Sequence, residues 1–309
     1  MSQVPVIDMM PLADIGQPKR LAFEIHKQLR AQYGSVPLRL PLDGIAAAVR
    51  IAGIREFETT SFEGTLVLQD GVGAIGLRKG MTRGRRNFTL GHELGHYLIP
   101  THRLSKTRFE CTSGFMGYRR GKRDEWERRP TLERIEVEAN EFSAALLVAI
   151  PEYREERTKL GRGCDVAHVR PLAEAFAVSQ EMMASVYVSH EPETAAIVTS
   201  HKGEVRRVIP KSGFPYMGLR PGMEIPRASL TREFRAANDA GEVSNIQEVE
   251  IHTWIERKGN VSSLCEQVIL QRDGWAMTLL SVEEDEEDDE ADDRNWNRRN
   301  IPRRASSYS

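Results

Sequence analysis

The chain has 309 residues, 40 % of them hydrophobic, and a formal net charge of −2 at pH 7. This length suits two or three domains with cores of their own, and no apolar stretch reaches the roughly 18 to 20 residues that a membrane helix needs. The three cysteines, Cys111, Cys164 and Cys265, are widely scattered. Scattered cysteines go against a disulfide framework and are typical of inert thiols in a reducing compartment. We therefore expect a cytoplasmic protein without a membrane segment.

The charge is unevenly distributed along the chain. Residues 283–293 include ten acidic side chains, and five arginines follow them. Removing both groups from the totals of 45 acidic and 43 basic residues leaves 35 and 38, so residues 1–282 carry a net charge of +3. Such a small excess is no strong signature of nucleic-acid binding. We predict that residues 283–309 form a disordered, charged tail.

The first third of the chain alternates between helical and strand patterns. Residues 20–33 repeat apolar side chains at helical spacing and predict a first helix. A second helix is predicted over residues 43–53, which begin with a good N-cap. Residues 65–69 and 74–77 predict two strands joined by a glycine-containing turn. A helix over residues 85–98 follows, and a proline is expected to stop it.

The middle of the chain predicts an insertion and three helices. Residues 105–131 are polar, basic and irregular, so we interpret them as a long loop or insertion. A longer helix is predicted over residues 132–148 because its apolar side chains form one stripe. Residues 165–189 have the rhythm of two short helices in a helix-turn-helix arrangement.

Beyond residue 192 the pattern changes to short strands separated by turns. The predicted strands cover residues 195–199, 204–209, 248–256, 267–270 and 275–282. This alternation predicts a mixed α+β domain at the C-terminal end of the chain.

The most informative motif is HELGH, which places His92, Glu93 and His96 on the predicted helix 85–98. The two histidines are four residues apart, so both imidazoles lie on one helix face within reach of one zinc ion. Zinc lowers the pKa of the water that it binds to about 7. Glu93 lies beside the metal, where it can take a proton from water and pass it to a leaving amine. HEXXH on a helix is a fairly specific signal of a metallopeptidase.

A zinc site of this kind needs a third protein ligand, and three residues are candidates. Glu136 and Asn140 share one face of the downstream helix, so Glu136 can bind the metal while Asn140 orients a ligand histidine through its other ring nitrogen. Glu138 projects about 160° away from Glu136 on that helix and needs a different register. His102 follows the second histidine at the spacing of metzincins, although the glycine of that class is missing. Of the three, we predict that Glu136 is the ligand.

The residue that stabilises the oxyanion is left open by the sequence. Tyr97, His102, Tyr118 and His168 are the candidates. For each of them, an ordinary packing or surface role is preferred.

Three sequence patterns together resemble the ImmA/IrrE family of bacterial metallopeptidases. They are the HELGH motif, the pattern E-x-E-A-N-x-F-[AS]-A-x-L-L that begins at Glu136, and a lead-in at residues 85–90 that is similar to R-x-R-F-T. The resemblance extends over roughly residues 20–190 and includes the helix-turn-helix-like segment. Two departures are the insertion at residues 105–131 and Ser143, which replaces the usual alanine.

The resemblance implies a minimal gluzincin that holds one Zn²⁺, with Mn²⁺ also tolerated. It implies that His92, His96 and Glu136 bind the metal and that Glu93 is catalytic. The implied substrate is a partner repressor of the XRE helix-turn-helix type, whose cleavage derepresses stress, phage or mobile-element genes.

The predicted fold class is α+β, and we expect four parts. Residues 1–160 form a gluzincin-like metallopeptidase domain, and residues 161–191 form the helix-turn-helix-like segment. Residues 192–282 form the α+β domain, which resembles the GAF-like sensor domain that comes last in IrrE-type members. Residues 283–309 form the tail.

The alternative function is that of a DNA-binding transcription regulator with a structural or vestigial metal site. A helix that reads DNA normally presents basic or amide side chains and is flanked by cations that bind phosphate. The second predicted helix of the helix-turn-helix-like segment, residues 180–190, contains no lysine or arginine. Direct DNA binding is therefore disfavoured, and a protein-docking or packing role is preferred.

Overall fold

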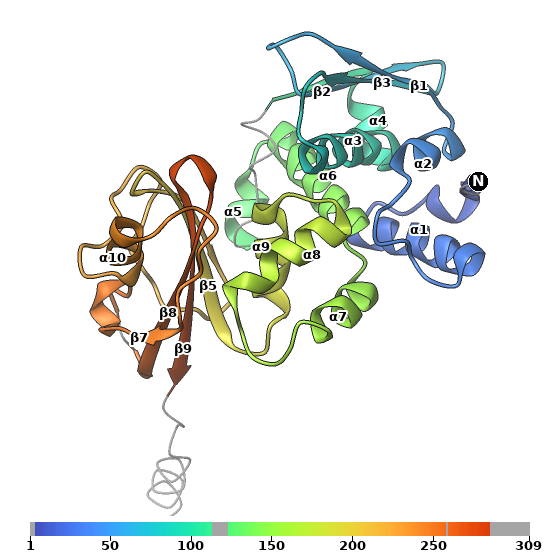
Figure 1. Cartoon of the computed structure of the whole chain (residues 1–309). Coiled ribbons are helices and arrows are strands. Elements are labelled where there is room, and N and C mark those ends of the chain that lie inside the picture. Colours follow the sequence, from blue (N-terminus) through green and yellow to red (C-terminus); the bar gives the residue numbers. More distant parts are fainter. Residues whose placement is uncertain (1–3, 113–122, 258, 285–309) are drawn as a thin grey trace, which may run out of the picture. The chain divides into compact units, whose positions relative to one another are not determined.

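A computed structural model describes residues 4–112, 123–257 and 259–284 (Figure 1). The chain divides into two compact units, Met1–His190 and Glu191–Ser309. Helices and two separate β-sheets make up these units, which confirms the predicted α+β class. The predicted tail lies outside the described residues from residue 285 onward, as do residues 113–122 of the predicted insertion.

The first unit contains one sheet and most of the helices. Its strands are β1 (Ile51–Phe57), β2 (Gly64–Gln69), β3 (Val72–Arg78) and β4 (Arg108–Cys111). Its helices are α1 (Pro18–Tyr33), α2 (Leu42–Ala48), α3 (Arg83–Leu98), α4 (Pro100–Ser105), α5 (Arg123–Arg128), α6 (Thr131–Leu147), α7 (Ile150–Thr158), α8 (Val169–Phe176) and α9 (Gln180–His190), with 3-10 turns η1 (Met10–Leu12) and η3 (Val166–His168).

The sheet of the first unit has the strand order β1-β3-β2-β4. Strands β2 and β3 form the predicted hairpin, and its two turn residues, Asp70 and Gly71, both have positive φ, as a tight two-residue turn requires. Strand β1 runs parallel to β3, and β4 pairs antiparallel with β2. Helix α3 packs against β2, β3 and α6, so it lies between the sheet and α6 (Figure 1).

Ion pairs hold the beginning of α3 in this position. Arg85 pairs with Glu63, which directly precedes β2. Arg86 pairs with Asp43 of α2 at 2.9 Å. The hydroxyl of Thr82 accepts a hydrogen bond from the backbone N–H of Arg85 and caps the helix. The lead-in before HELGH therefore anchors the motif helix to its neighbours.

Two predictions about local structure in the first unit are wrong. Helix α2 ends at Ala48, and Arg50 adopts a φ of 69°, after which the chain enters β1 instead of continuing the helix to residue 53. Parallel pairing of β1 with β3 outweighs the local helical pattern there. The segment 105–131 is no uniform loop, because it contains β4 and α5. The pairing partner of β4 is some 40 residues away, so no local pattern reveals it.

In this unit, prolines lie in the first turn of a helix as well as just after the end of one. Helix α3 ends at Leu98, and Pro100 is the first residue of α4. Pro151 likewise lies in the first turn of α7. The missing N–H of a proline leaves no hydrogen bond unmade in the first turn, so the chain turns into a new helix there.

The helix pair predicted at residues 165–189 is present as α8 and α9. Helix α8 ends at Ala177, which adopts the left-handed conformation with a φ of 53°. Its buried face includes Leu172, Ala173 and Phe176. The pair therefore packs as a helix-turn-helix, and whether it forms a part of its own stays a prediction.

The second unit is built on a five-stranded sheet with the order β6-β5-β9-β8-β7. Its elements are β5 (Thr194–His201), β6 (Glu204–Pro210), α10 (Leu230–Ala237), β7 (Gln247–Glu248), η4 (Ile251–Thr253), β8 (Val261–Leu270), η5 (Arg272–Gly274) and β9 (Trp275–Glu284). All strand pairs in this sheet are antiparallel. The GAF-like identity of this unit stays a prediction.

The predicted strand at residues 248–256 is wrong beyond Glu248. Trp254 and Ile255 are consecutive and both buried, a pattern that an alternating strand does not give. Both side chains belong to the apolar core of the second unit. No helix among the described residues is long and apolar enough to cross a membrane.

Candidate metal centre

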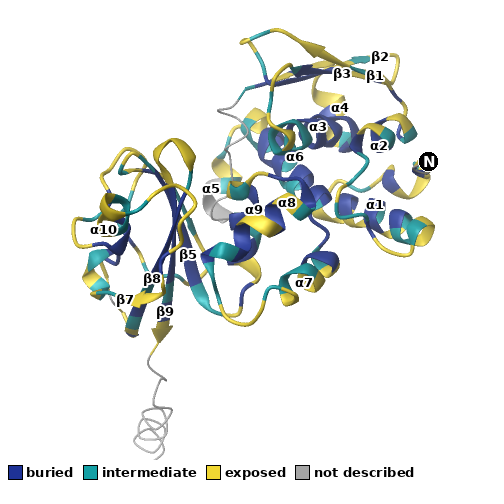
Figure 2. Cartoon of the chain, viewed as in Figure 1, coloured by how far each residue is buried: buried dark blue, intermediate teal, exposed yellow. Residues whose placement is uncertain are grey.

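The HELGH motif lies in the most buried part of α3. Every residue from 89 to 98 is buried, which Figure 2 shows as a continuous dark stretch of that helix. His92, Glu93 and His96 have no exposed surface at all. The polar side chains are buried because the sheet covers one side of α3 and α6 covers another. Buried polar groups of this kind need partners, and neighbouring elements supply them.

Glu136 reaches the two histidines from α6. Its carboxylate oxygens lie 3.2 Å from His92 Nε2 and 3.7 Å from His96 Nε2. The two Nε2 atoms are 3.0 Å apart. Close packing of α3 on α6 brings these groups together, because Gly95 lets the Ala139 backbone approach. The structure thus brings together the three residues that the sequence predicts as ligands.

A fourth side chain, Cys111 of β4, completes the cluster. Its Sγ lies 3.2 Å from His92 Nε2 and 3.5 Å from His96 Nε2. The donor atoms of Cys111, His92, His96 and Glu136 all lie within 4.8 Å of one another. Sequence reasoning missed Cys111 and treated it as an inert thiol. The signal in the sequence was the alternation of Phe109 and Cys111 with charged residues, which marks a short half-buried strand.

A hydrogen bond to Asn140 fixes the tautomer of His92. The ring Nδ1 lies 2.9 Å from the Asn140 side-chain oxygen, so Nδ1 carries the hydrogen and donates it. When His92 is neutral, its Nε2 atom then presents its lone pair to the cluster. Asn140 therefore occupies the orienting position that the sequence predicts for it.

A longer chain of hydrogen bonds fixes the tautomer of His96. His102 Nε2 lies 3.0 Å from the Glu138 carboxylate, so this nitrogen donates and the other ring nitrogen of His102 accepts. That acceptor, Nδ1, lies 3.2 Å from His96 Nδ1, which therefore donates. His102 and Glu138, the two alternative ligands, lie behind His96 and outside the four-residue cluster.

The arrangement of the two oriented histidines and Glu136 is unfavourable unless a cation lies between them. With both imidazoles neutral, the two Nε2 lone pairs face each other at 3.0 Å and repel, and Oε2 of Glu136 is buried with no hydrogen-bond partner among the described residues. A divalent cation between these groups attracts both Nε2 lone pairs and the Glu136 carboxylate, so each contact becomes favourable. Nitrogen, oxygen and sulfur donors are the set that zinc prefers. The residues of this cluster therefore fit a zinc ion.

The carboxylate of Glu93 lies beside the cluster. Both of its oxygens are buried and have no hydrogen-bond partner among the residues that the structure describes. A Cβ atom on Gly64 of β2 would fall 2.3 Å from Oε1 of Glu93, so the absence of a side chain there makes room for the carboxylate. Burial raises the pKa of Glu93 to about 7. Such a group can gain and lose a proton near neutral pH.

Burial and mutual contact also set the protonation of the cluster. Burial lowers the pKa of His96 to about 3, so its imidazole is neutral. Burial alone would raise the pKa of Glu136, but contact with His92 and His96 holds it well below its usual range. Burial and the neighbouring carboxylates raise the pKa of the Cys111 thiol. Burial disfavours the charged form of His92, but contact with Glu136 and the charge of Glu93 raise its pKa overall. Metal binding requires neutral imidazoles and an ionised carboxylate.

The candidates for oxyanion stabilisation are spread over the first unit. Tyr97 directs its hydroxyl toward the Gly71 carbonyl at 3.4 Å, and His168 contacts the Tyr187 hydroxyl at 3.0 Å. Neither of these hydrogen bonds involves a member of the metal cluster. Tyr118 lies outside the described residues. His102 is the only one of the four that the structure shows in contact with a cluster histidine.

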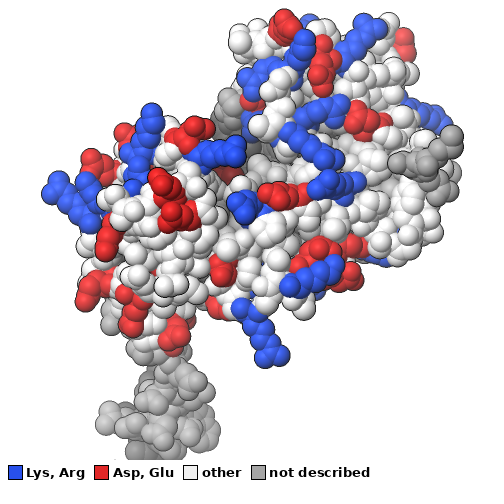
Figure 3. Space-filling model, viewed as in Figure 1, with Lys and Arg blue, Asp and Glu red and all other residues white. Residues whose placement is uncertain are grey.

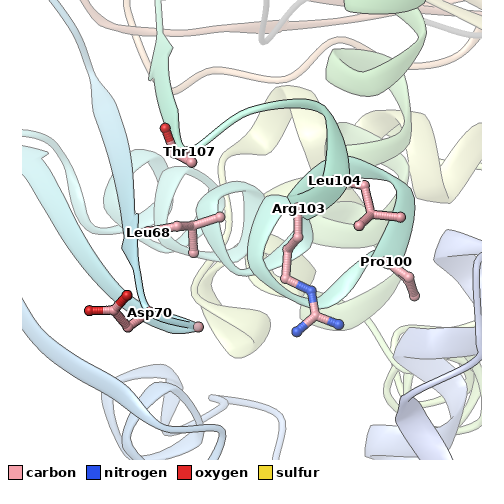
Figure 4. Close-up of a pocket in the computed structure, with 7 residues that line it drawn as sticks. Leu68, Asp70, Pro100, Arg103, Leu104 and Thr107 are labelled. Carbon is pink, nitrogen blue, oxygen red and sulfur yellow. The ribbon is translucent and has the colours of Figure 1, made fainter.

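A pocket on the first unit lies apart from this site. It has a volume of about 360 Å³ and is lined by Leu68, Asp70, Gly71, Pro100, Arg103, Leu104 and Thr107 (Figure 4). Figure 4 shows Arg103 and Leu104 on α4 facing the end of the β2–β3 hairpin. None of the lining residues belongs to the metal cluster.

A helix-borne HEXXH motif beside a glutamate from a second helix is the arrangement of a metallopeptidase-type domain. Residues 54–185 match the family model Peptidase_M78, described as the IrrE N-terminal-like domain. The first unit therefore contains an IrrE N-terminal-like domain, as the motifs predict.

Solved structures and curated proteins add no support for a particular function. Among solved structures, a Mycobacterium tuberculosis transcriptional regulator matches over 89 % of this chain and 74 % of that chain, with 12 % sequence identity and a TM-score of 0.47. No curated protein matches the chain.

Proposed function

We propose that this protein is a zinc-dependent endopeptidase in which His92, His96 and Glu136 hold the metal and Glu93 is the general base and acid. The observation that carries the proposal is the Glu93 carboxylate, which is buried beside the cluster without a hydrogen-bond partner among the described residues. An unpaired buried carboxylate is costly for folding, so its retention calls for a functional explanation.

The chain's own residues suit peptide hydrolysis. Zinc, when bound, polarises a carbonyl and lowers the pKa of water. Glu93 takes a proton on its free carboxylate and releases it to the nitrogen of the leaving amine. Gly64 leaves the space in which this carboxylate stands. Asn140 and His102 keep the two ligand histidines in the tautomer that faces the cluster.

The sheet edge supports a peptide as the substrate. Strand β4 is at the edge of its sheet, and among the described residues it pairs with β2 alone. An extended peptide can add to such an edge through main-chain hydrogen bonds. Cys111 of β4 contacts both ligand histidines, so a peptide on that edge would lie next to the metal cluster. We therefore propose an exposed, extended segment of a protein as the target.

The identity of the target is proposed from the family resemblance. We propose a partner repressor of the XRE type, acting in the cytoplasm on stress, phage or mobile-element genes. The alternative role as a DNA-binding regulator gains no support from α9, which contains no lysine or arginine. On the face in Figure 3, Lys and Arg side chains are interspersed with Asp and Glu side chains and form no continuous basic surface.

The test compares purified wild type, Glu93→Gln and Glu136→Gln for bound zinc and for cleavage of the repressor encoded nearest to the gene. We expect about one zinc in wild type and Glu93→Gln, much less zinc in Glu136→Gln, and a discrete cut by wild type only. Glu133→Gln, at the partly exposed start of the same helix, is the matched control and should behave as wild type.

Two outcomes would contradict the proposal. Equal cleavage by Glu93→Gln and wild type would remove Glu93 from the chemistry. Full zinc content in Glu136→Gln would remove Glu136 from the ligand set.

A further inference from the structure

The spacings around the two Nε2 atoms of the metal cluster are close to those of a tetrahedral zinc site. The distances that link Nε2 of His92 and Nε2 of His96 to each other, to Cys111 Sγ and to the Glu136 carboxylate range from 3.0 to 3.7 Å. Zinc bonds of about 2.0 Å to nitrogen or oxygen and about 2.3 Å to sulfur place tetrahedral donors roughly 3.3 to 3.6 Å apart. The cluster therefore already has the dimensions of a four-ligand site, and Cys111 occupies one of its four corners.

The Cys111 thiol has more acceptors around it than its single hydrogen can serve, because the carboxylates of Glu93 and Glu136 lie close to it as well as the two imidazoles. His92 Nε2 faces the Cys111 sulfur at 3.2 Å, but the ring hydrogen of His92 is on Nδ1, which is engaged by Asn140. The thiol has one hydrogen and contacts two Nε2 atoms, at 3.2 and 3.5 Å. A sulfur that lies between two imidazole lone pairs is placed as a ligand of a shared ion.

Cys111 comes from a different part of the fold than the other three donors. His92 and His96 are on α3 and Glu136 is on α6, whereas Cys111 ends β4. The Cys111 carbonyl accepts a hydrogen bond from the Glu63 N–H at 2.9 Å, which holds the end of the strand in place. The ring of Phe109 stacks on His96 with 4.3 Å between ring centroids. The strand thus presents the thiol to a His/His/Glu set that is complete without it.

We propose that Cys111 is the fourth protein ligand of the metal and that it closes the site in the resting protein. A structural zinc site has four protein ligands, whereas a catalytic site keeps one position open for water or substrate. Cys111 occupies that position here. Resting on the proposed peptidase function, the consequence is that the thiolate must leave the metal before a peptide can be cleaved, so wild type cleaves more slowly than a variant with an open fourth position.

Cobalt(II) in place of zinc tests the thiolate bond without any measurement of cleavage. A thiolate bound to cobalt gives a charge-transfer band in the near ultraviolet, which nitrogen and oxygen ligands do not give. We expect this band in the full-length wild type, its loss in Cys111→Ala and Cys111→Ser with one cobalt still bound, and its retention in the matched control Cys265→Ala. Absence of the band in wild type would overturn the proposal, whether or not the variants fold.

Acetohydroxamate tests whether the fourth position is closed. This small chelator binds a metal that has an open position and changes the visible spectrum of cobalt. We expect its apparent dissociation constant to be at least about tenfold higher for wild type than for Cys111→Ser, because the thiolate must be displaced first. Equal dissociation constants for the two proteins would show that Cys111 does not close the site.

These readouts separate the present proposal from the proposed function. Loss of the cobalt band in the Cys111 variants supports the ligand assignment even if no protein substrate is cleaved. Failure of wild type and of Cys111→Ser alike to cleave the neighbouring repressor would count against the peptidase function and leave the ligand assignment intact. Cleavage by Cys111→Ser no faster than by wild type would overturn the inference that Cys111 slows cleavage.

Discussion

At the scale of single residues, the orientation of His92 and His96 depends on side chains outside the metal cluster. His96 is oriented by His102, which in turn donates to Glu138. We expect His102→Ala to weaken zinc binding by about 10- to 100-fold, because His96 loses the acceptor that fixes its tautomer. Competition with a zinc-binding dye measures this change. Glu138→Gln keeps an oxygen that can accept from His102, so its loss of affinity should be clearly smaller.

The space around Glu93 gives a second prediction at this scale. Gly64→Ala would place a methyl group 2.3 Å from Oε1 of Glu93 and 2.6 Å from Thr89, so the carboxylate must move. We expect cleavage to fall by at least about tenfold while the zinc content stays near one, since misplacement by about 1 Å can cost 100-fold. Gly53→Ala in β1 is the control, because its added methyl group meets no atom within 4 Å. Unchanged cleavage by Gly64→Ala would mean that the position of Glu93 does not matter.

The sequence predicts the ligands that share a helix more readily than those that share only a sheet. Two histidines at helical spacing must face the same way, so His92 and His96 are found from their separation alone. Glu136 is predicted from helical geometry and family resemblance, and the structure places it beside them. Cys111 reaches the cluster through the pairing of β4 with β2, and Gly64 lies opposite it in that pairing. A contact set by strand register leaves little trace in a local pattern.

At the scale of secondary-structure elements, the site depends on the close packing of α3 on α6. Gly91 of α3 lies against Ser143 of α6, and a Cβ on Gly91 would fall 2.6 Å from the serine Oγ. That Oγ donates to the Phe88 carbonyl at 2.8 Å, which links the two helices. The serine in place of the usual alanine therefore adds a hydrogen bond between α3 and α6.

This contact predicts a non-additive pair of substitutions. We expect Gly91→Ala to lower the free energy of unfolding by about 1 to 3 kcal/mol through overpacking. Ser143→Ala should cost about 1 kcal/mol, since it removes one hydrogen bond. The double variant should be less unstable than the sum of the two, because the atom that Gly91→Ala meets is gone. Urea unfolding of all four proteins at equal zinc content tests this, and strict additivity would contradict the packing argument.

A buried histidine between α1 and α6 gives a prediction about pH. His26 Nε2 lies 2.7 Å from the Leu146 carbonyl and donates to it, and burial lowers the pKa of His26 below its usual value. The unfolded chain therefore binds a proton at this histidine before the folded chain does as the pH falls. Below a pH of about 6.5, His26 removes up to about 1.4 kcal/mol of stability per pH unit, and above that pH it has no such effect.

The substitution His26→Leu tests the sign of this effect. The variant loses the hydrogen bond to Leu146 and should be less stable at pH 7.5, but its stability should fall less steeply than that of wild type between pH 6.5 and 5. Urea unfolding at several pH values measures both slopes. His190→Leu, which changes an exposed histidine, should keep the slope of wild type. A slope for His26→Leu as steep as that of wild type would contradict the prediction.

The sequence predicts the elements that have a periodic apolar pattern of their own. It does not predict the strands whose pairing partners lie far away in the chain. The helical stripes of α1 and α6 and the hairpin of β2 and β3 agree with the structure, because neighbouring residues determine them. Strand β1 was mistaken for the end of a helix, since its partner β3 lies beyond β2 in the chain. Residues 261–266 of β8 are not predicted, because Ser262, Ser263 and Glu266 interrupt the apolar pattern there although Val261 and Leu264 are buried.

At the scale of the whole molecule, the two units have separate cores. The second unit contains two apolar clusters of its own, one around Trp254 and one around Leu230. The metal cluster belongs entirely to the first unit. The composition predicts several domains with cores of their own. It does not predict the number of strands in the second sheet or their order. That order depends on which strands pair across long connections, such as β5 with β9.

A buried carboxylate in the second unit allows the independence of the two cores to be tested. Glu266 has no exposed surface, and its oxygens accept hydrogen bonds from the backbone N–H groups of Leu230 and Thr231, from the Thr231 hydroxyl and from Trp254 Nε1. These contacts join the start of α10 and the Trp254 ring to strand β8. The negative charge also lies at the positive end of the α10 dipole.

Glu266→Gln should therefore destabilise the second unit without affecting the metal site. The amide group replaces one acceptor oxygen with a donor that faces other donors, so we expect a loss of about 3 kcal/mol from the unfolding free energy of this unit. In a Trp126→Phe background, which removes the tryptophan of the first unit, tryptophan fluorescence during urea unfolding reports on the second unit, and zinc content reports on the first. Glu248→Gln, at an exposed position on β7, should change neither. Loss of zinc in Glu266→Gln in parallel with the loss of stability would show that the two cores unfold as one.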